Sequence, residues 1–484
     1  MFDIGISEII CTKRYEDVNG LSIKYDAEAA EKPTTCPYFH SDVIHNEPRL
    51  HIHSSQQNLI RDTRSEGKLV FINLKIKRYR CSECGRIVSD RFTFYDKHSH
   101  MTYRLREEFV RRCINGETFS YIARDYGVDH KTVSAAFRAY TDSHKEILSY
   151  AYTPEVLGID EAHIDDHYRL VLTDVKEQKL LDIKKDNSQK TVRAYLQTLD
   201  KSVCKCATMD FAPAYAKAIS SVLPEAIIVI DKFHVVQEIN RCLDNVRKDL
   251  QNKYRKQGID IRRFKKSRTL FMTNWEDLNE KSVEALDSWF REFPELYEAY
   301  LCKETFRDIY LTAEDHEEAS RMFDLWIDAV PDYERFYPMK KTMTSRKQHI
   351  LNYWYYKWTN AYTESVNNLI KGIAKAGRGY KFETLRERCL LGINRQKPER
   401  FDPKTAEYKP SDKISKETDN MSRKKELYRV IGDAPNEPND IPLRECVIVY
   451  LEMESSVELR EKEFYDRIMA FHERLSTQIR RRSI

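Results

Sequence analysis

Three aspartates in the middle of the chain each follow a short apolar stretch. Asp160 follows VLGI, Asp210 follows ATM and Asp231 follows IIVI. Runs of this kind are typical of buried strands, and an open sheet places metal ligands or catalytic groups near the carboxyl ends of its strands. A strand-end aspartate can also be only a turn former or a helix cap. The repetition of the pattern favours a site.

The elements that must position these acids alternate between strands and helices. Helical spacing follows at 191–200, and Pro213 suits the first turn of a helix, where a missing N–H costs nothing. We expect strands ending at the three acids, further strands at 167–175 and 179–186, and a long amphipathic helix after Asp231. The order strand, strand, strand, helix, strand, helix, strand, helix predicts an α/β fold with acids ending the first, fourth and fifth strands.

This order resembles an RNase H-like fold, whose first and fourth strands carry the first two acids of a DDE active site. The phrases GIDE, MDFAPAY, DKFHVVQEIN and TESVNNLIKGI closely resemble the ISL-three family of bacterial insertion-sequence transposases. The resemblance runs from about Cys36 to about Arg395. It implies that the catalytic, metal-binding acids are Asp160, Asp210 and Glu364, the last of them on a later helix.

The resemblance implies a transposase that cleaves double-stranded DNA and joins it to a target. Two divalent ions about 3.5–4 Å apart can activate the nucleophile and stabilise the leaving oxygen. We expect Mg²⁺, or Mn²⁺ in its place, with Asp160 bridging two ions and Asp210 and Glu364 completing one each. Water would cut at the terminal inverted repeats of the element, and the freed 3′-hydroxyl would attack target DNA.

Four further residues could support this chemistry. Asp231 and His234 fit the Asp-x-x-His motif that the family shows after its second acid. Asp231 could equally cap the helix that it precedes, and His234 could make a hydrogen bond in the core. Asn367 and Lys371 lie about one and two helical turns past Glu364 and could hold phosphate or the helix register.

The N-terminal region contains a possible zinc site. A strand rich in apolar and basic residues enters CSEC at 81–84, and CPYFH at 36–40 lies upstream. The family usually has two Cys-x-x-Cys pairs here, but Phe39 stands where the second cysteine of the first pair belongs. We expect tetrahedral zinc that folds this small module. The expected ligands are Cys36, His40, Cys81 and Cys84, with His45, His51 and His53 as other candidates and a metal-free knuckle as the alternative.

Two regions could bind DNA directly. ETFSYIARDYGVDHKTVSAAFRAY at 117–140 predicts a helix-turn-helix, with Gly127 in the turn and Asp129 capping the second helix. An ordinary helical hairpin is the alternative. Between Arg247 and Arg268, ten lysines and arginines outnumber two aspartates, which suits either a DNA track or a solvated face. The predicted DNA contacts are His130, Lys131, Thr132, Ser134, Lys75, Lys77, Arg262, Arg263, Lys265 and Lys266.

Composition sets limits on the rest. The chain has 484 residues and a net charge of +4 with 33% charged residues, so DNA binding must use local basic patches. No apolar run approaches the roughly 18 residues of a membrane helix, and the first residues lack a signal-peptide pattern. Eleven cysteines, an odd number, do not suggest a disulfide framework, so we expect a protein of the bacterial cytosol.

We therefore expect an RNase H-like catalytic core with a large all-α insertion, preceded by a zinc-knuckle-like module and a helix-turn-helix. The expected regions are 1–95 (zinc-binding-like), 96–150 (helix-turn-helix), 151–250 (first part of the core), 251–350 (helical insertion), 351–395 (last part of the core) and 396–484 (charged tail ending in an amphipathic helix). A homodimer or larger assembly on DNA is expected.

Two other classes of protein remain open. A regulator descended from a transposase would bind DNA through the knuckle and the helix-turn-helix without catalysis. The presence of all three acids argues against it. A structure-specific nuclease on the same fold would cut without joining. The zinc-like region and the helix-turn-helix favour an enzyme that reads specific terminal repeats.

Overall fold

The computed structural model describes residues 2–34, 36–38, 50–149, 152–258, 260–331, 333–395, 400–402 and 407–409. The chain forms two compact units. The first comprises Met1–Ala151, His163–His167 and Asn368–Arg395, and the second comprises Tyr152–Ala162, Tyr168–Asn367 and Gln396–Ile484. The amphipathic helix expected near the C-terminus lies outside the described residues.

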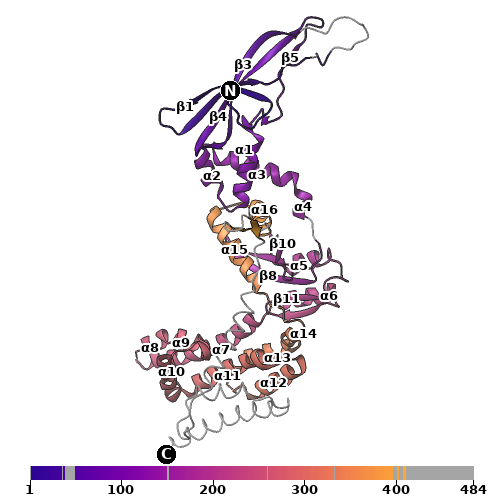
Figure 1. Ribbon diagram of the computed structural model, residues 1–484. Helices are drawn as coiled ribbons and strands as arrows, with labels where there is room; N and C mark the ends of the chain where they lie inside the picture. The colour runs from indigo at the N-terminus through magenta and orange to yellow at the C-terminus, as the bar shows by residue number, and fades with distance from the viewer. Residues whose placement is uncertain are drawn as a thin grey trace, which may run out of the picture. The chain divides into compact units, whose positions relative to one another are not determined.

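A seven-stranded sheet forms the N-terminal part of the first unit (Figure 1). Its two longest strands form an antiparallel pair that turns at Glu66 and Gly67, both with positive φ. Alternate residues of the central strands, among them Ile23, Ile60 and Ile72, are fully buried in one core. The strands are β1 (Ile9–Glu16), β2 (Ser22–Ala29), β3 (Leu50–Ser65), β4 (Lys68–Cys81), β5 (Ile87–Ser89), β6 (Tyr95–Asp96) and β7 (Met101–Thr102).

This sheet gives the N-terminal region a larger fold than the expected zinc module. Its core is built from apolar residues of β1 to β4, and β4 pairs with both β2 and β3. The sequence pattern missed this sheet because β2 and β4 pair in parallel, across a connection that contains β3. The region therefore has sources of stability other than a bound metal.

The expected helix-turn-helix is present. Gly127 ends its first helix in the left-handed conformation, with φ of 60°, and the Asp129 side chain accepts a hydrogen bond from the backbone N–H of Lys131. Ile122, Val133 and Phe137 form its core. The helices are α1 (Tyr103–Ile114), α2 (Phe119–Tyr126), α3 (His130–Ser143) and α4 (Lys145–Ser149).

A helix from the far end of the chain completes this core. Arg388 of α16 (Phe382–Ile393) is buried, and its guanidinium lies over the rings of Phe119, Phe137 and Tyr380 at 5.1–5.8 Å. It also donates to the backbone carbonyl of Glu117 at 2.9 Å. The helix-turn-helix therefore does not close its core with residues 96–150 alone.

The second unit contains a five-stranded sheet in the order β10-β9-β8-β11-β12. β9 and β10 pair antiparallel, whereas β8, β11 and β12 pair in parallel. Helices α5 and α6 supply apolar side chains to one core with β8 and β9. The elements are β8 (Val156–Ile164), β9 (His167–Asp174), β10 (Lys179–Lys184), α5 (Gln189–Leu196), β11 (Cys206–Met209), α6 (Pro213–Val222), β12 (Ile227–Ile230) and α7 (Lys232–Lys256).

The prediction that Asp160 ends its strand was wrong. β8 continues to Ile164 and stops at a turn in which Asp165 and Asp166 both have positive φ. Polar residues are tolerated beyond Asp160 because β8 approaches this turn. Asp210 and Asp231 do follow directly after β11 and β12, and Pro213 begins α6, as expected.

Helices occupy the long segment before Glu364, as predicted. Trp289, Phe306 and Trp326 are among the large side chains buried in their core. The helices are α8 (Arg262–Lys266), α9 (Arg268–Met272), η1 (Trp275–Asp277), α10 (Glu280–Glu292), α11 (Pro294–Thr312), α12 (His316–Ala329), α13 (Tyr337–Leu351), α14 (Tyr353–Tyr356) and then α15 (Ala361–Gly377). Two short strands, β13 (Arg400–Asp402) and β14 (Glu407–Lys409), pair antiparallel. None of the helices in the described ranges combines the length and the apolar character needed to cross a membrane.

Candidate active site

The register of the parallel strands aligns three acids. Thr208 of β11 pairs with Gly158 of β8, so Asp210 continues the row that contains Asp160. Met209 pairs with Ile230 of β12, so Asp231 follows beside Asp210. Neighbouring parallel strands therefore carry Asp160, Asp210 and Asp231 toward one region of the sheet edge.

Asp160 is buried and held by two hydrogen bonds. The backbone N–H of Glu161 donates to its Oδ1 at 2.7 Å, and Nδ2 of Asn367 donates to its Oδ2 at 2.9 Å. Burial raises the pKa of Asp160 to about 6, and the charges of Asp210 and Glu364 act in the same direction while His234 opposes them. A carboxylate in this position is costly without a compensating cation.

Burial also raises the pKa of the two other acids predicted to be catalytic. Asp210 accepts a hydrogen bond from the backbone N–H of Ala212 at 2.9 Å, which opposes the effect of burial on its pKa. For Glu364, burial comes first and the charge of Asp231 adds to it. The charges of Asp210 and Glu364 both act on Asp160, and His234 acts on all three acids.

Close packing of α15 against β8 and β9 places Glu364 near Asp160. Gly158 makes this possible, since a Cβ there would lie 2.3 Å from Oγ1 of Thr173 and 2.4 Å from Oγ1 of Thr363. These two hydroxyls share a hydrogen bond of 2.7 Å. Just before α15, Asn360 is fully buried and accepts a hydrogen bond from Thr208 at 3.0 Å.

Asp231 and His234 lie beside Glu364. Ligand atoms of Asp231, His234 and Glu364 all fall within 4.8 Å of one another. Asp231 stands at the N-cap position of α7, and the backbone N–H groups of Asn360 and Phe233 favour its ionised form. Burial raises its pKa, and His234 opposes that shift.

The residues that follow Glu364 on α15 differ in their surroundings. Asn367 is buried against Asp160, whereas Asn368 and Lys371 are exposed. Glu161, next to Asp160, accepts hydrogen bonds from Tyr215 at 3.1 Å and from Asn187. The sequence did not single out Asn360 and Thr363, although both stand within one turn before Glu364.

The predicted DNA contacts of the helix-turn-helix lie at the start of α3. His130 and Lys131 are exposed, and Thr132 and Ser134 are half-buried. Arg138, two turns after Lys131, is also exposed and was missed by the sequence analysis. A helical spacing of seven from Lys131 would have identified it.

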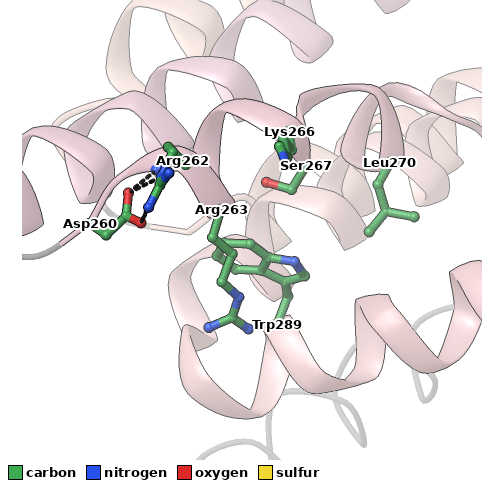
Figure 2. Close-up of a pocket in the computed structure, with 7 residues that line it drawn as sticks. All are labelled: Asp260, Arg262, Arg263, Lys266, Ser267, Leu270 and Trp289. Carbon is green, nitrogen blue, oxygen red and sulfur yellow. Dashed lines mark hydrogen bonds and ion pairs between the residues drawn. The ribbon is translucent and has the colours of Figure 1, made fainter.

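The basic segment after α7 borders an open cavity of about 550 Å³. Figure 2 shows that the side chain of Arg262 turns toward Asp260, with which it forms an ion pair at 2.8 Å. Arg263 lies 3.9 Å above the ring of Trp289 and pairs with Glu292. The cavity is lined by Asp260, Arg262, Arg263, Lys266, Ser267, Leu270 and Trp289.

Four of the lysines predicted to contact DNA differ in their exposure. Lys265 and Lys266 on α8 are exposed, as is Lys75 on β4. Lys77 is instead held in an ion pair with Glu28 at 2.6 Å and is mostly covered. Lys77 therefore stabilises the sheet through this ion pair and is less available to DNA than the other three lysines.

Three cysteines of the N-terminal sheet converge. Sulfur atoms of Cys36, Cys81 and Cys84 lie within 4.8 Å of one another, and those of Cys36 and Cys84 are 3.6 Å apart. The backbone N–H of Cys84 lowers the pKa of the Cys81 thiol, which favours the thiolate that binds metal. His40 and His45 lie outside the described residues, while His51 and His53 lie on β3.

Two family models match the chain. Residues 91–141 match the helix-turn-helix domain of transposase family ISL3, and residues 157–389 match the ISL3 model described as a transposase. The chain belongs to the ISL3 family of insertion-sequence transposases. The family expected from the four sequence phrases is thereby confirmed.

This ISL3 transposase is similar to two curated proteins. One is the transposase for insertion sequence element IS1001 of Bordetella parapertussis, 23% identical over 345 residues that cover 68% of this chain and 82% of that protein. The other is the transposase for insertion sequence element IS1557 of Mycobacterium tuberculosis, 27% identical over 224 residues that cover 41% and 50%.

Proposed function

We propose that this ISL3 transposase binds the terminal repeats of an insertion sequence, cleaves DNA there and transfers the freed strand to a target. The observation that carries the proposal is the convergence of Asp160, Asp210 and Glu364. They come from distant segments, and the charges of Asp210 and Glu364 both raise the pKa of Asp160. Perturbed carboxyl groups gathered in one place are typical of a catalytic centre.

The sheet supports assignment of an RNase H-like core. Numbered along the chain, its strands lie in the order three, two, one, four, five, with the first three forming a meander and the last two parallel to the first. The third acid arrives on α15 after the helical segment α8–α14. The helical segment thus separates Glu364 from the sheet along the chain, although the two are close together in the folded protein.

The donor set fits hard divalent cations, because carboxylate oxygens prefer Mg²⁺ or Mn²⁺. Asp160, Asp210 and Glu364 would hold them, and two such ions would activate the attacking oxygen and stabilise the leaving one. Asn367 and the Glu161 N–H fix the orientation of the Asp160 carboxylate. Each of its oxygens accepts one of these bonds and keeps lone pairs for a cation.

The remaining modules supply DNA recognition. His130, Lys131, Thr132, Ser134 and the newly identified Arg138 would enter a groove from α3, as recognition helices do. Lys75, Lys265, Lys266 and the cavity arginines Arg262 and Arg263 would contact phosphate. Zinc bound by Cys36, Cys81, Cys84 and a histidine such as His40 would brace the end of β4.

Cleavage and joining on DNA that carries the element's own ends tests the proposal. Glu364→Gln removes a metal-binding charge with little change in shape, so we expect cleavage to fall by at least about a hundredfold with DNA affinity unchanged. Glu383→Gln, an exposed glutamate on α16, is the matched control and should behave as wild type.

The same assay separates the rival functions. Binding without cleavage in the wild-type protein would indicate a regulator. Cutting without joining would indicate a nuclease. Full joining by Glu364→Gln would contradict the assignment of the third acid.

A further inference from the structure

A second set of donors stands beside the proposed catalytic acids. Asp231 follows β12, His234 lies in the first turn of α7, and Glu364 lies in the first turn of α15. Their ligand atoms fall within 4.8 Å of one another. Two carboxylates and one imidazole therefore share a space of the size that a single cation fills.

The imidazole of His234 has a ring nitrogen without a hydrogen-bond partner among the described residues. This nitrogen, Nε2, is buried. Oε1 of Glu364 is only 3.4 Å from this nitrogen, but the two are not aligned for a hydrogen bond. A buried nitrogen without a hydrogen-bond partner destabilises the fold, so a ligand that this nitrogen can bind would stabilise the site.

Asp231 is the second buried donor of this set. It is 2% exposed and occupies the N-cap position of α7. The backbone N–H groups of Asn360 and Phe233 favour its ionised form. Its carboxylate is also within ligand distance of His234 and Glu364, so it can offer a charged oxygen to a cation there.

These contacts have a simple electrostatic reading. Two carboxylates this close repel each other unless a positive charge lies between them. A divalent cation supplies that charge, and it binds the Nε2 lone pair that His234 presents when its Nδ1 carries the proton.

We propose that Asp231, His234 and Glu364 bind a divalent cation through one imidazole nitrogen and two carboxylates. Glu364 would thus share its cation with Asp231 and His234, beside the ion held by Asp160 and Asp210. A nitrogen donor favours Mn²⁺ and later transition metals over Mg²⁺, because Mg²⁺ prefers oxygen ligands throughout. The inference rests on the proposed function only for the use of the ion and not for its binding.

Pulsed electron paramagnetic resonance of Mn²⁺ bound to the full-length protein tests this directly, without DNA. We expect nitrogen modulation from a bound imidazole, and its replacement by the ¹⁵N pattern after labelling with ¹⁵N-histidine. Cys36, Cys81 and Cys84 are soft donors and compete poorly for Mn²⁺. Bound Mn²⁺ without histidine coupling would overturn the proposal, and this result needs no variant that could misfold.

Variants assign the nitrogen to one residue. His234→Ala should abolish the coupling and weaken Mn²⁺ binding by about tenfold or more, with a smaller effect on Mg²⁺. His167→Ala, at an exposed histidine after the β8 turn, is the control and should change neither. Retained coupling in His234→Ala, or an Mn²⁺ affinity within twofold of wild type, would contradict the assignment.

Failure of this inference and failure of the proposed function give different results. Coupling in a protein that never joins DNA ends would leave the metal site standing and remove the transposition proposal. Normal joining of DNA ends without histidine coupling would remove the metal site and leave the transposition proposal standing.

Discussion

Asp160 holds its proton at a higher pH than an ordinary aspartate. Burial is the main cause, and its pKa in the folded protein is about 6, whereas an unfolded aspartate titrates near about 3.9. The folded state therefore binds this proton more tightly than the unfolded state does. Without metal, ionisation of Asp160 lowers the free energy of unfolding as pH rises from about 4 through about 6, and the full penalty is present above that range.

Asp160→Asn should remove this penalty. In EDTA, we expect the variant to be more stable than wild type by on the order of 2–3 kcal/mol at pH 8 and nearly equal to it at pH 4, as measured by denaturant titration. Asp186→Asn is the control of opposite sign, because hydrogen bonds from Ser188 and Thr191 lower the pKa of Asp186. A stabilisation of the Asp160 variant that did not depend on pH would contradict the argument.

Asn367 is placed to act on the proposed reaction through Asp160. It is buried, and its Nδ2 donates to Oδ2 of Asp160 at 2.9 Å, so it is a positioning residue. Asn367→Ala should lower Mn²⁺ affinity and DNA cleavage by about 10–100-fold, as loss of a partner behind a metal ligand does. Asn368→Ala changes the exposed neighbour and should alter neither. Equal effects of the two variants would show that the amide of Asn367 does not orient Asp160.

At the scale of elements, the contact between β8 and α15 depends on a glycine, Gly158, at the point where they meet. Gly158→Ala would place a Cβ 2.3 Å from Thr173 Oγ1 and 2.4 Å from Thr363 Oγ1. The strand and the helix must then separate, which typically costs about 1–3 kcal/mol and moves Glu364 away from Asp160. We expect a lower melting temperature and a larger loss of cleavage than the loss of stability explains.

Gly372→Ala is the matched control for that substitution. Gly372 lies within α15, and no atom would come within 4 Å of a new Cβ. Alanine there should raise helix stability by about 0.5–1 kcal/mol and leave cleavage unchanged. If both alanines had the same effect on cleavage, close packing at Gly158 would not be what positions Glu364.

The sequence predicted these elements wherever a local pattern determines them. Gly127 and Asp129 determine the helix-turn-helix within a few residues, and short, mostly apolar stretches predict β11 and β12 before Asp210 and Asp231. The end of β8 was predicted wrongly because a hairpin turn, rather than the apolar run before Asp160, terminates it.

Contacts between distant segments carry the information that the sequence alone did not yield. Asn367 was expected to hold phosphate or the helix register, but its partner is a carboxylate more than two hundred residues earlier. Thr363 on α15 could not be singled out because its partner, Thr173, lies on β9, 190 residues earlier. Only the folded sheet makes these residues neighbours, so no spacing rule could have paired them.

At the scale of the whole molecule, one continuous stretch of chain carries the proposed third acid and then completes the core of the helix-turn-helix. Glu364 lies in the first turn of α15, and the next helix, α16, buries Arg388 against Phe119 and Phe137 of the helix-turn-helix. The recognition helix therefore depends on residues that follow the catalytic segment. A protein without that segment should not present a stable α3.

Arg388→Ala tests this dependence. It removes a guanidinium stacked over Phe119, Phe137 and Tyr380 and a hydrogen bond to the Glu117 carbonyl, leaving a cavity in the core of α2 and α3. We expect a loss of about 2–4 kcal/mol in the stability of this unit. DNA affinity should fall with it, although Arg388 is buried and cannot reach DNA.

Arg395→Ala separates this effect from loss of charge. Arg395 also reaches the helix-turn-helix, donating to Asn115 at 2.8 Å, but it does so at an exposed position. Its removal deletes the same charge without opening a cavity, so stability should change by less than about 1 kcal/mol. Hydrogen exchange of α3 amides should quicken in Arg388→Ala and not in Arg395→Ala. If α3 stayed protected in both, the helix-turn-helix would be an independent module, and α16 would only pack against its surface.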